Sequence, residues 1–192
     1  MDRLAAFAVM LFCWPVIALG HWELKAVDST FQYATVKNGS KYEINSFEQM
    51  SGAISSSGIA TLKVELASVN TGISIRDSRM KTMLFDLIKF PAAVVTLPVD
   101  TEQLMNMDVG ELWPLSTGGK LNLNGEEQTV LAELHVYRIS AERWLVKTAQ
   151  PVIVDASNFK LVKGIEALRE VAGLKSIMPM VPVHLELVFE KI

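Results

Sequence analysis

The histidine and cysteine side chains are the groups in this sequence best suited to nucleophilic, acid–base or metal chemistry. The chain has one cysteine, Cys13, and three histidines, His21, His135 and His184. A nucleophilic site needs a base within hydrogen-bond reach, and a metal site needs several ligands at short spacing. The sequence has neither a nucleophile-elbow motif nor a metal-ligand spacing. We therefore predict no catalytic residue, no enzyme activity, no cofactor and no metal site.

The charged pair Arg76-Asp77 precedes residues 78–88, where apolar residues recur three and four positions apart, as on one face of a helix. We expect Asp77 to be the N-cap of that helix. Arg76 is expected to pair with a carboxylate or a backbone carbonyl, and direct contact with a ligand is the alternative. Gly118-Gly119 precedes a strand pattern rather than a helix, so we expect a turn there and no phosphate loop.

An apolar run near the N-terminus has the features of a signal peptide. Residues 4–19 are almost wholly apolar and follow Arg3, and this run of 16 residues is shorter than the ~20 that a spanning helix needs. Small residues stand at Ala18 and Gly20, so we predict cleavage before His21. Residues 1–20 would then be the signal peptide, and residues 21–192 would be a periplasmic protein. An uncleaved membrane anchor is the alternative.

Cleavage at this position has two chemical consequences. Cys13 is lost with the signal peptide, so the mature protein can form no disulfide. His21 becomes the first residue, and an imidazole beside a free amine can chelate copper or nickel. A copper-binding protein that uses His21 is therefore one alternative function.

The composition is that of an ordinary globular protein. The 192 residues are 50% hydrophobic, and 18 Lys and Arg stand against 21 Asp and Glu, for a net charge of −3. This length is that of one domain, and the charge gives no basic surface for a nucleic acid. We predict one domain and no nucleic-acid partner.

Most of the mature chain alternates between apolar and polar residues, which is the pattern of half-buried strands. The alternation is clearest over residues 62–66 and 183–189. Residues 121–123 lead through Gly125 into alternating positions 130–136, which predicts a β-hairpin. Further strands are expected over residues 22–26, 31–36, 41–47, 93–99 and 144–154. About eight strands of this kind predict an all-β fold, an antiparallel β-barrel.

One or two short helices are expected to close or flank this barrel. They cover residues 78–88 and residues 164–174, the second ending near Gly173. A barrel of eight strands is about wide enough to be filled by its own side chains or to hold one slim ligand. The periodicity does not decide between a barrel filled by its side chains and a barrel that holds a ligand.

One segment of the chain resembles the YceI-like family. Its landmarks occur in the family's order, as Ser68-Val69-Asn70-Thr71-Gly72, Arg76-Asp77, Phe85-Asp86 and Phe90-Pro91. Downstream, residues 119–125 and Val181-Pro182-Val183 resemble the family's hairpin and terminal strand, and the resemblance extends from Trp22 to the C-terminus. The chain departs from the family at Arg79, where a histidine is frequent, and at Leu84, where phenylalanine is usual.

The resemblance implies one lipocalin-like barrel domain over residues 21–192, exported to the periplasm, whose interior holds a polyisoprenoid or similar long-chain lipid without catalysis. The expected ligand-binding residues are inward-facing strand positions, two phenylalanines of the family-like segment and the arginine beside it: Leu62, Val64, Leu66, Arg76, Phe85, Phe90, Leu123, Val183, Leu185, Leu187 and Phe189. A periplasmic interaction or redox-accessory module with a packed barrel is the main alternative. A homodimer and transient membrane contact are compatible with the sequence, which does not determine the lipid's length or head group.

Overall fold

The computed structural model describes residues 20–192 of the chain. The predicted signal peptide falls on residues outside this part except for Gly20, and the His21 side chain also lies outside it. Export and copper binding at His21 therefore stay predictions. Among residues 20–192, no helix is long and apolar enough to cross a membrane.

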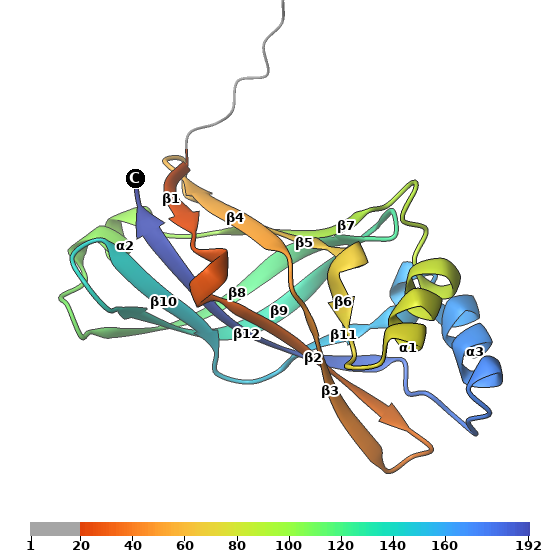
Figure 1. The fold of residues 1–192 in the computed structure, drawn as a ribbon. Helices are drawn as coiled ribbons and strands as arrows, with labels where there is room; N and C mark the ends of the chain where they lie inside the picture. Colours follow the sequence, from red (N-terminus) through yellow and green to blue (C-terminus); the bar gives the residue numbers. More distant parts are fainter. Residues whose placement is uncertain (1–19) are drawn as a thin grey trace, which may run out of the picture.

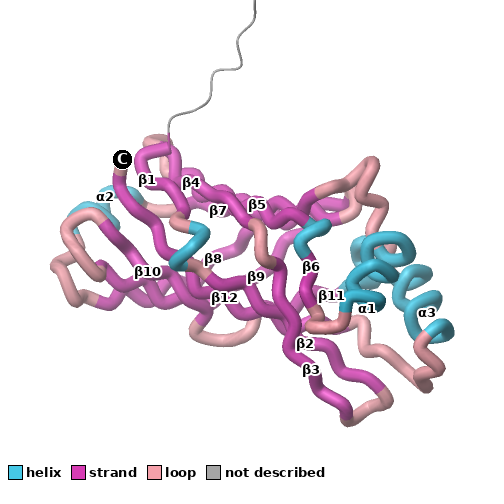
Figure 2. The backbone as a smooth tube through the Cα atoms, in the orientation of Figure 1, coloured by secondary structure: helices cyan, strands magenta, loops and turns pink. Residues whose placement is uncertain are grey.

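Antiparallel strands form most of the molecule (Figures 1 and 2). They are β1 (Gly20–Leu24), β2 (Thr30–Lys37), β3 (Lys41–Phe47), β4 (Met50–Ser55), β5 (Ile59–Glu65), β6 (Val69–Asn70), β7 (Ala92–Pro98), β8 (Leu112–Leu123), β9 (Glu126–Arg138), β10 (Arg143–Thr148), β11 (Val152–Asp155) and β12 (Met180–Lys191). Eight of them follow one another as β1-β4-β5-β7-β8-β9-β10-β12, and β12 pairs back to β1. The predicted eight-stranded antiparallel barrel, lipocalin-like in form, is confirmed.

The last strand, β12, joins the closed barrel to a longer extension. Its C-terminal half pairs with β10 and β1, whereas its N-terminal half pairs with β11 and β2. The sheet then continues through β3 to β6. Along β12, Leu187 and Phe189 are buried while His184 and Glu186 are exposed, as the alternation predicts. The barrel is therefore prolonged beyond its closed ring toward the end that carries α1 and α3 (Figure 1).

A packed aromatic cluster closes the opposite end of the barrel beneath the helix α2 (Thr101–Asn106). The rings of Trp22 and Trp144 meet edge to face with centroids 5.7 Å apart, and Trp144 Nε1 donates to the Leu104 carbonyl at 3.2 Å. Met107 is only 1% exposed. The sequence reasoning missed α2, although Asp100 accepts a hydrogen bond from the Gln103 amide as an N-cap.

The other end carries α1 (Ser74–Arg79), which continues as a π turn over Met80–Leu84, and α3 (Val162–Val171). Gly164 lets the two helices touch, because a Cβ there would lie 2.7 Å from the Met83 carbonyl oxygen. The predicted second helix is confirmed, although it begins two residues and ends three residues earlier than expected. Figure 2 shows both helices grouped at this end.

The predicted boundaries of the first helix were wrong. The helix begins at Ser74 with Ile73 as the N-cap, and helical structure ends at Leu84, so Ile88 is outside it and almost fully exposed. Asp77 is not the cap: its Oδ1 accepts hydrogen bonds from the Thr71 amide at 2.9 Å and the Thr71 hydroxyl at 2.6 Å. Asp77 thus ties the preceding loop to the helix instead of beginning it.

Two strand predictions also need correction. Gly118-Gly119 is not a turn but lies inside β8, where a Cβ on Gly119 would come within 3.2 Å of Val95 Cγ2 on the neighbouring strand. Residues 144–154 form two strands, β10 and β11, because the chain turns before Pro151, which has no amide hydrogen for a ladder. The short helical turns of the fold are the 3₁₀ segments Ala26–Asp28, Leu66–Ser68 and Ala156–Phe159.

Candidate binding cavity

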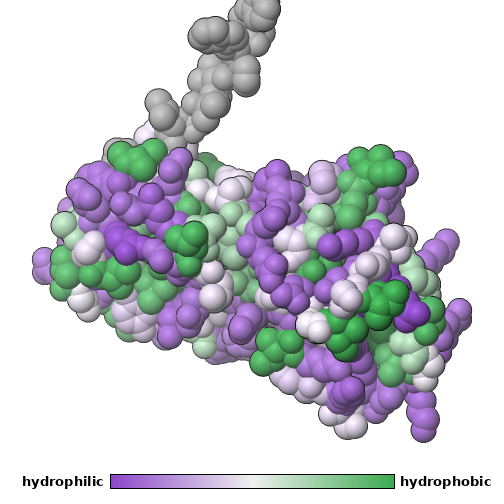
Figure 3. All heavy atoms as spheres, in the orientation of Figure 1, coloured by the Kyte–Doolittle hydropathy of each residue, from purple (hydrophilic) through white to green (hydrophobic). Residues whose placement is uncertain are grey.

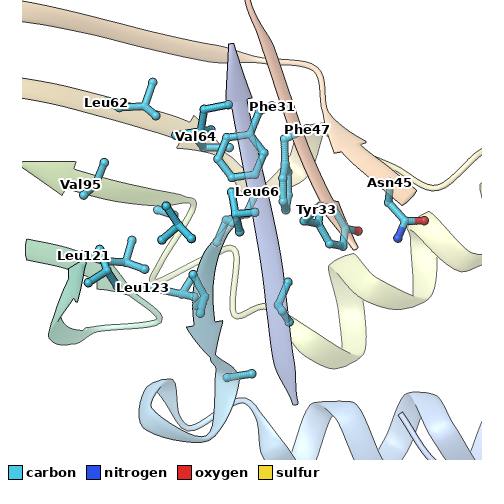
Figure 4. A pocket seen from close by; sticks show the side chains of 18 of the residues that line it. Phe31, Tyr33, Asn45, Phe47, Leu62, Val64, Leu66, Val95, Leu121 and Leu123 are labelled. Carbon is cyan, nitrogen blue, oxygen red and sulfur yellow. The ribbon is translucent and has the colours of Figure 1, made fainter. Parts of the chain in front are cut away.

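The interior of the barrel contains a cavity of about 530 Å³. Strands β2 to β5 and β7 to β12 supply inward side chains to its wall, and most of these are aliphatic or aromatic. Figure 4 shows Leu62, Val64 and Val95 on one side of the space, with the aromatic rings of β2 and β3 on another. The volume lies within the range of roughly 300–1,000 Å³ that ligand pockets span. Side chains therefore do not fill this barrel.

Ten of the eleven predicted binding residues line this cavity. They are Leu62, Val64, Leu66, Arg76, Phe85, Leu123, Val183, Leu185, Leu187 and Phe189. Phe90 was wrongly expected to point inward. Its ring instead covers the β8–β9 turn, where a Cβ on Gly125 would lie 2.7 Å from Phe90 Cε1. Contact of the ten residues with a ligand stays a prediction.

An aromatic cluster that the sequence reasoning did not single out forms part of the wall. Phe47 lies 5.5 Å from Phe31 and 5.2 Å from Tyr33 between ring centroids, and 6.3 Å from Phe85. The Tyr33 hydroxyl donates to Met80 Sδ at 3.7 Å, and burial raises the pKa of Tyr33 well above its usual value. The alternation of Phe31 and Tyr33 in β2 was a signal that could have placed both side chains inside.

The cavity opens at the end that carries α1 and α3. Four large apolar side chains both line the cavity and are more than two-fifths exposed, namely Ile73, Ile75, Val171 and Met178. They come from α1 and the residue before it, from the C-terminal end of α3, and from the segment that precedes β12. We call the opening between these three segments the mouth.

Polar side chains gather beside the mouth. Apart from Thr61 and the phenol of Tyr33, the lining residues with ionisable, amide or hydroxyl groups are Thr35, Lys37, Asn45, Thr71, Arg76 and Arg79. Glu43 on β3 links two of these cations, since its Oε2 is 2.8 Å from Arg76 Nη1 and also bonds Lys37. The hydrogen bond from Lys37 is the largest cause that lowers the pKa of Glu43 to about 2, so this carboxylate is ionised. The expected pairing of Arg76 with a carboxylate is confirmed.

The described residues offer no cluster of side chains suited to a metal ion. Residues 20–192 contain no group of three or more His, Cys, Asp or Glu side chains placed to hold a metal ion, the unplaced side chain of His21 aside. His184 is exposed and His135 half-buried, and both occupy outward positions of their strands, as predicted. Within the described residues, the candidate functional site is therefore the apolar cavity together with the polar side chains at its mouth.

The comparisons with known proteins point to one family. Residues 22–189 match the YceI-like domain. A polyisoprenoid-binding domain from Saccharophagus degradans, implicated in plant cell wall breakdown, superimposes with a TM-score of 0.88 at 35% sequence identity, covering 90% of this chain and 99% of that one. No curated protein matches the sequence significantly.

Two more distant structures share the fold. Burkholderia cenocepacia BcnA has a TM-score of 0.66 at 16% identity, over 86% of this chain and 98% of that one. A Campylobacter jejuni YceI protein has a TM-score of 0.50 at 14% identity, over 74% and 82% of the two chains. Because the family match spans nearly the whole described barrel, this chain belongs to the YceI-like family.

Proposed function

We propose that this protein is a non-enzymatic, exported carrier that holds a polyisoprenoid-type lipid in its barrel. The observation that carries the proposal is the apolar cavity, which the inward residues of ten strands surround without filling. The Saccharophagus degradans domain, which is described as polyisoprenoid-binding, supports the same class of ligand because it is 35% identical over almost its full length. The packed-barrel alternative has no support in this interior.

The walls suit a ligand that is recognised by its hydrocarbon. A polyisoprenoid has no polar group along its chain, and burying each CH₂-sized group contributes ~0.8 kcal/mol. A few isoprene units would therefore offset an association cost of ~4–15 kcal/mol. Branched and aromatic side chains such as Leu62, Val183 and Phe47 provide this surface.

The mouth suggests how such a lipid enters. Ile73, Ile75, Val171 and Met178 expose apolar surface around the opening, beside the cations Arg76 and Arg79. Figure 3 shows hydrophobic patches among polar side chains at the end that carries α1 and α3. Exposed apolar surface beside basic residues is suited to transient contact with a bilayer. We propose that the mouth faces the membrane when the lipid is exchanged.

The lipid itself is the direct test of this function. Protein purified from its native host should yield, on organic extraction and mass spectrometry, about one isoprenoid per molecule. A sample stripped with detergent and reloaded with the extract should regain it. Absence of any isoprenoid from the native protein, together with failure to take one up, would contradict the carrier function.

Export is tested separately, on the same native protein. Its N-terminal sequence should begin at His21, and fractionation should recover it from the periplasm. Recovery of a chain that retains Met1 in the membrane fraction would refute cleavage.

A further inference from the structure

One apolar residue at the mouth carries a side chain that oxidants can modify. Among the methionines of residues 20–192, Met80 and Met178 line the cavity. Met80 is only 8% exposed, and its sulfur accepts the hydrogen bond from the Tyr33 hydroxyl. Met178 is 45% exposed, so its thioether is open to solvent and also borders the space proposed for the lipid. Oxidants convert accessible thioethers to sulfoxides, so Met178 is the cavity residue most open to this reaction.

The main chain holds Met178 at the mouth. The residue lies in the segment that joins α3 to β12 (Figure 1). Its amide donates to the Val36 carbonyl at 2.9 Å, and its neighbour Ile177 forms a β-bridge with Lys37. Pro179 follows, and a residue before proline is restricted to extended backbone conformations. The thioether therefore stays at the mouth unless these contacts with β2 are broken.

Oxidation at this position changes the chemistry of the mouth. Met178 stands with Ile73, Ile75 and Val171 among its exposed apolar side chains. An added oxygen atom converts the flexible apolar side chain into a polar one. Hydrocarbon that covers this oxygen removes its water, and burying a polar group without a hydrogen-bond partner is unfavourable. The sulfoxide therefore opposes the binding of an apolar chain.

We propose that Met178 is a reversible oxidation site through which peroxides control lipid loading. The sulfur attacks one oxygen of a hydroperoxide, and the O–O bond breaks as the S–O bond forms. The hydroperoxide proton moves to the departing oxygen, which leaves as water or an alcohol. The sulfur loses two electrons and the peroxide gains them, and a methionine sulfoxide reductase with a dithiol reverses the change, releasing water. The proposal rests on the carrier function and adds regulation of the same cavity.

The chain supplies a matched control two residues away. Met180 is 41% exposed and belongs to β12, but it does not line the cavity. Because the two thioethers have similar exposure, peroxide should oxidise both at similar rates. Met105 near the closed end is a third exposed methionine, whereas Met80 and Met107 are buried and should react last. Only the sulfoxide at Met178 should weaken lipid binding.

Treatment of delipidated protein with hydrogen peroxide tests this site. Peptide mapping by mass spectrometry assigns the oxidised residues, and displacement of Nile red by geranylgeraniol measures the affinity. The double variant Met105→Leu/Met180→Leu keeps Met178 as the one exposed methionine of residues 20–192. Its oxidation should weaken geranylgeraniol binding by roughly three- to thirtyfold, less than full burial of a polar group would, because the mouth stays partly hydrated. Methionine sulfoxide reductases with dithiothreitol should restore the affinity.

Met178→Leu separates this site from general oxidative damage. Leucine keeps the mouth apolar, so the variant should bind geranylgeraniol as the wild type does and should keep that affinity after peroxide treatment. Met178 lies outside the packed core, so oxidised and untreated wild-type proteins should have the same melting temperature.

The outcomes for this site and for the carrier function are distinct. Unchanged affinity after complete oxidation of Met178, or an equal loss of affinity in peroxide-treated Met178→Leu, would overturn the oxidation site. A loss that follows a fall in melting temperature, or oxidation of Met80 or Met107 before Met178, would overturn it as well. Failure of the untreated protein to bind Nile red and geranylgeraniol would instead count against the carrier function, and the regulation proposed on it would fall with it.

Discussion

Replacing Leu185 with glutamine should reduce lipid retention more than it destabilises the fold. Leu185 lines the cavity on β12 and stands opposite Phe31 on β2. In a packed core, an amide buried without a partner costs about 1–3 kcal/mol. In the empty cavity the amide can be hydrated, so we expect a loss of unfolding free energy below about 1 kcal/mol.

Met107→Gln is the matched control for a packed site. Met107 is 1% exposed, lies outside the cavity lining and packs in the closed end of the barrel. For a domain of this size, 1 kcal/mol shifts the melting temperature by about 2–4 °C. The control should therefore melt about 2–12 °C below the wild type, and Leu185→Gln should melt less than about 4 °C below it.

Lipid retention should fall more in Leu185→Gln than in Met107→Gln, the opposite of the order in melting temperature. Bound hydrocarbon excludes water from the amide at position 185, so the same 1–3 kcal/mol now opposes binding and corresponds to roughly 5- to 150-fold in Kd. Retention is measured as extracted isoprenoid per mole of protein, beside the melting temperature of each delipidated variant. A large melting drop in Leu185→Gln with full retention would refute the reasoning and would place Leu185 in a packed wall.

Three further predictions follow from the same geometry. Ala132→Trp should fill the cavity and abolish isoprenoid retention measured by extraction, whereas Leu131→Trp at the exposed neighbouring position should not; equal retention in both would argue against a ligand in this space. Asp77→Ala should cost about 1–3 kcal/mol in thermal melts because two hydrogen bonds to Thr71 are lost, while an unchanged melt with lost retention would place Asp77 in the binding site. The folded-state pKa of Glu43 is about 2, below its ordinary value of 4.5, so the unfolded state takes up the proton first as the pH falls. The contribution of this group to stability is therefore present above about pH 4.5 and is lost as the pH falls toward 2. Urea unfolding across that window should show a weaker pH dependence in Glu43→Gln, and a slope identical to the wild type would contradict the pairing.

The sequence alone was sufficient where structure depends on near neighbours. Side chains two positions apart lie on one face of a strand, so the alternation of Val183, Leu185 and Leu187 placed these residues inside before any partner strand was known. The β8–β9 hairpin was equally local, because Asn124 and Gly125 adopt the positive φ angles that a tight turn requires. These signals predicted the barrel class and eight residues that line the cavity, whereas Arg76 and Phe85 were predicted from the family-like segment.

Tertiary structure decided what depends on segments far apart in the chain. The barrel closes through β1 and β12, from opposite ends of the sequence, and whether its interior is filled depends on how the side chains of many strands meet. The sequence shows that Arg76 is charged, but not which group it pairs with. Its partner Glu43 is 33 residues away, and only the packing of α1 against β3 brings the two together. The same packing leaves the Arg79 guanidinium without an ion pair among the described residues, because periodicity specifies the face of an element and not the element that it meets.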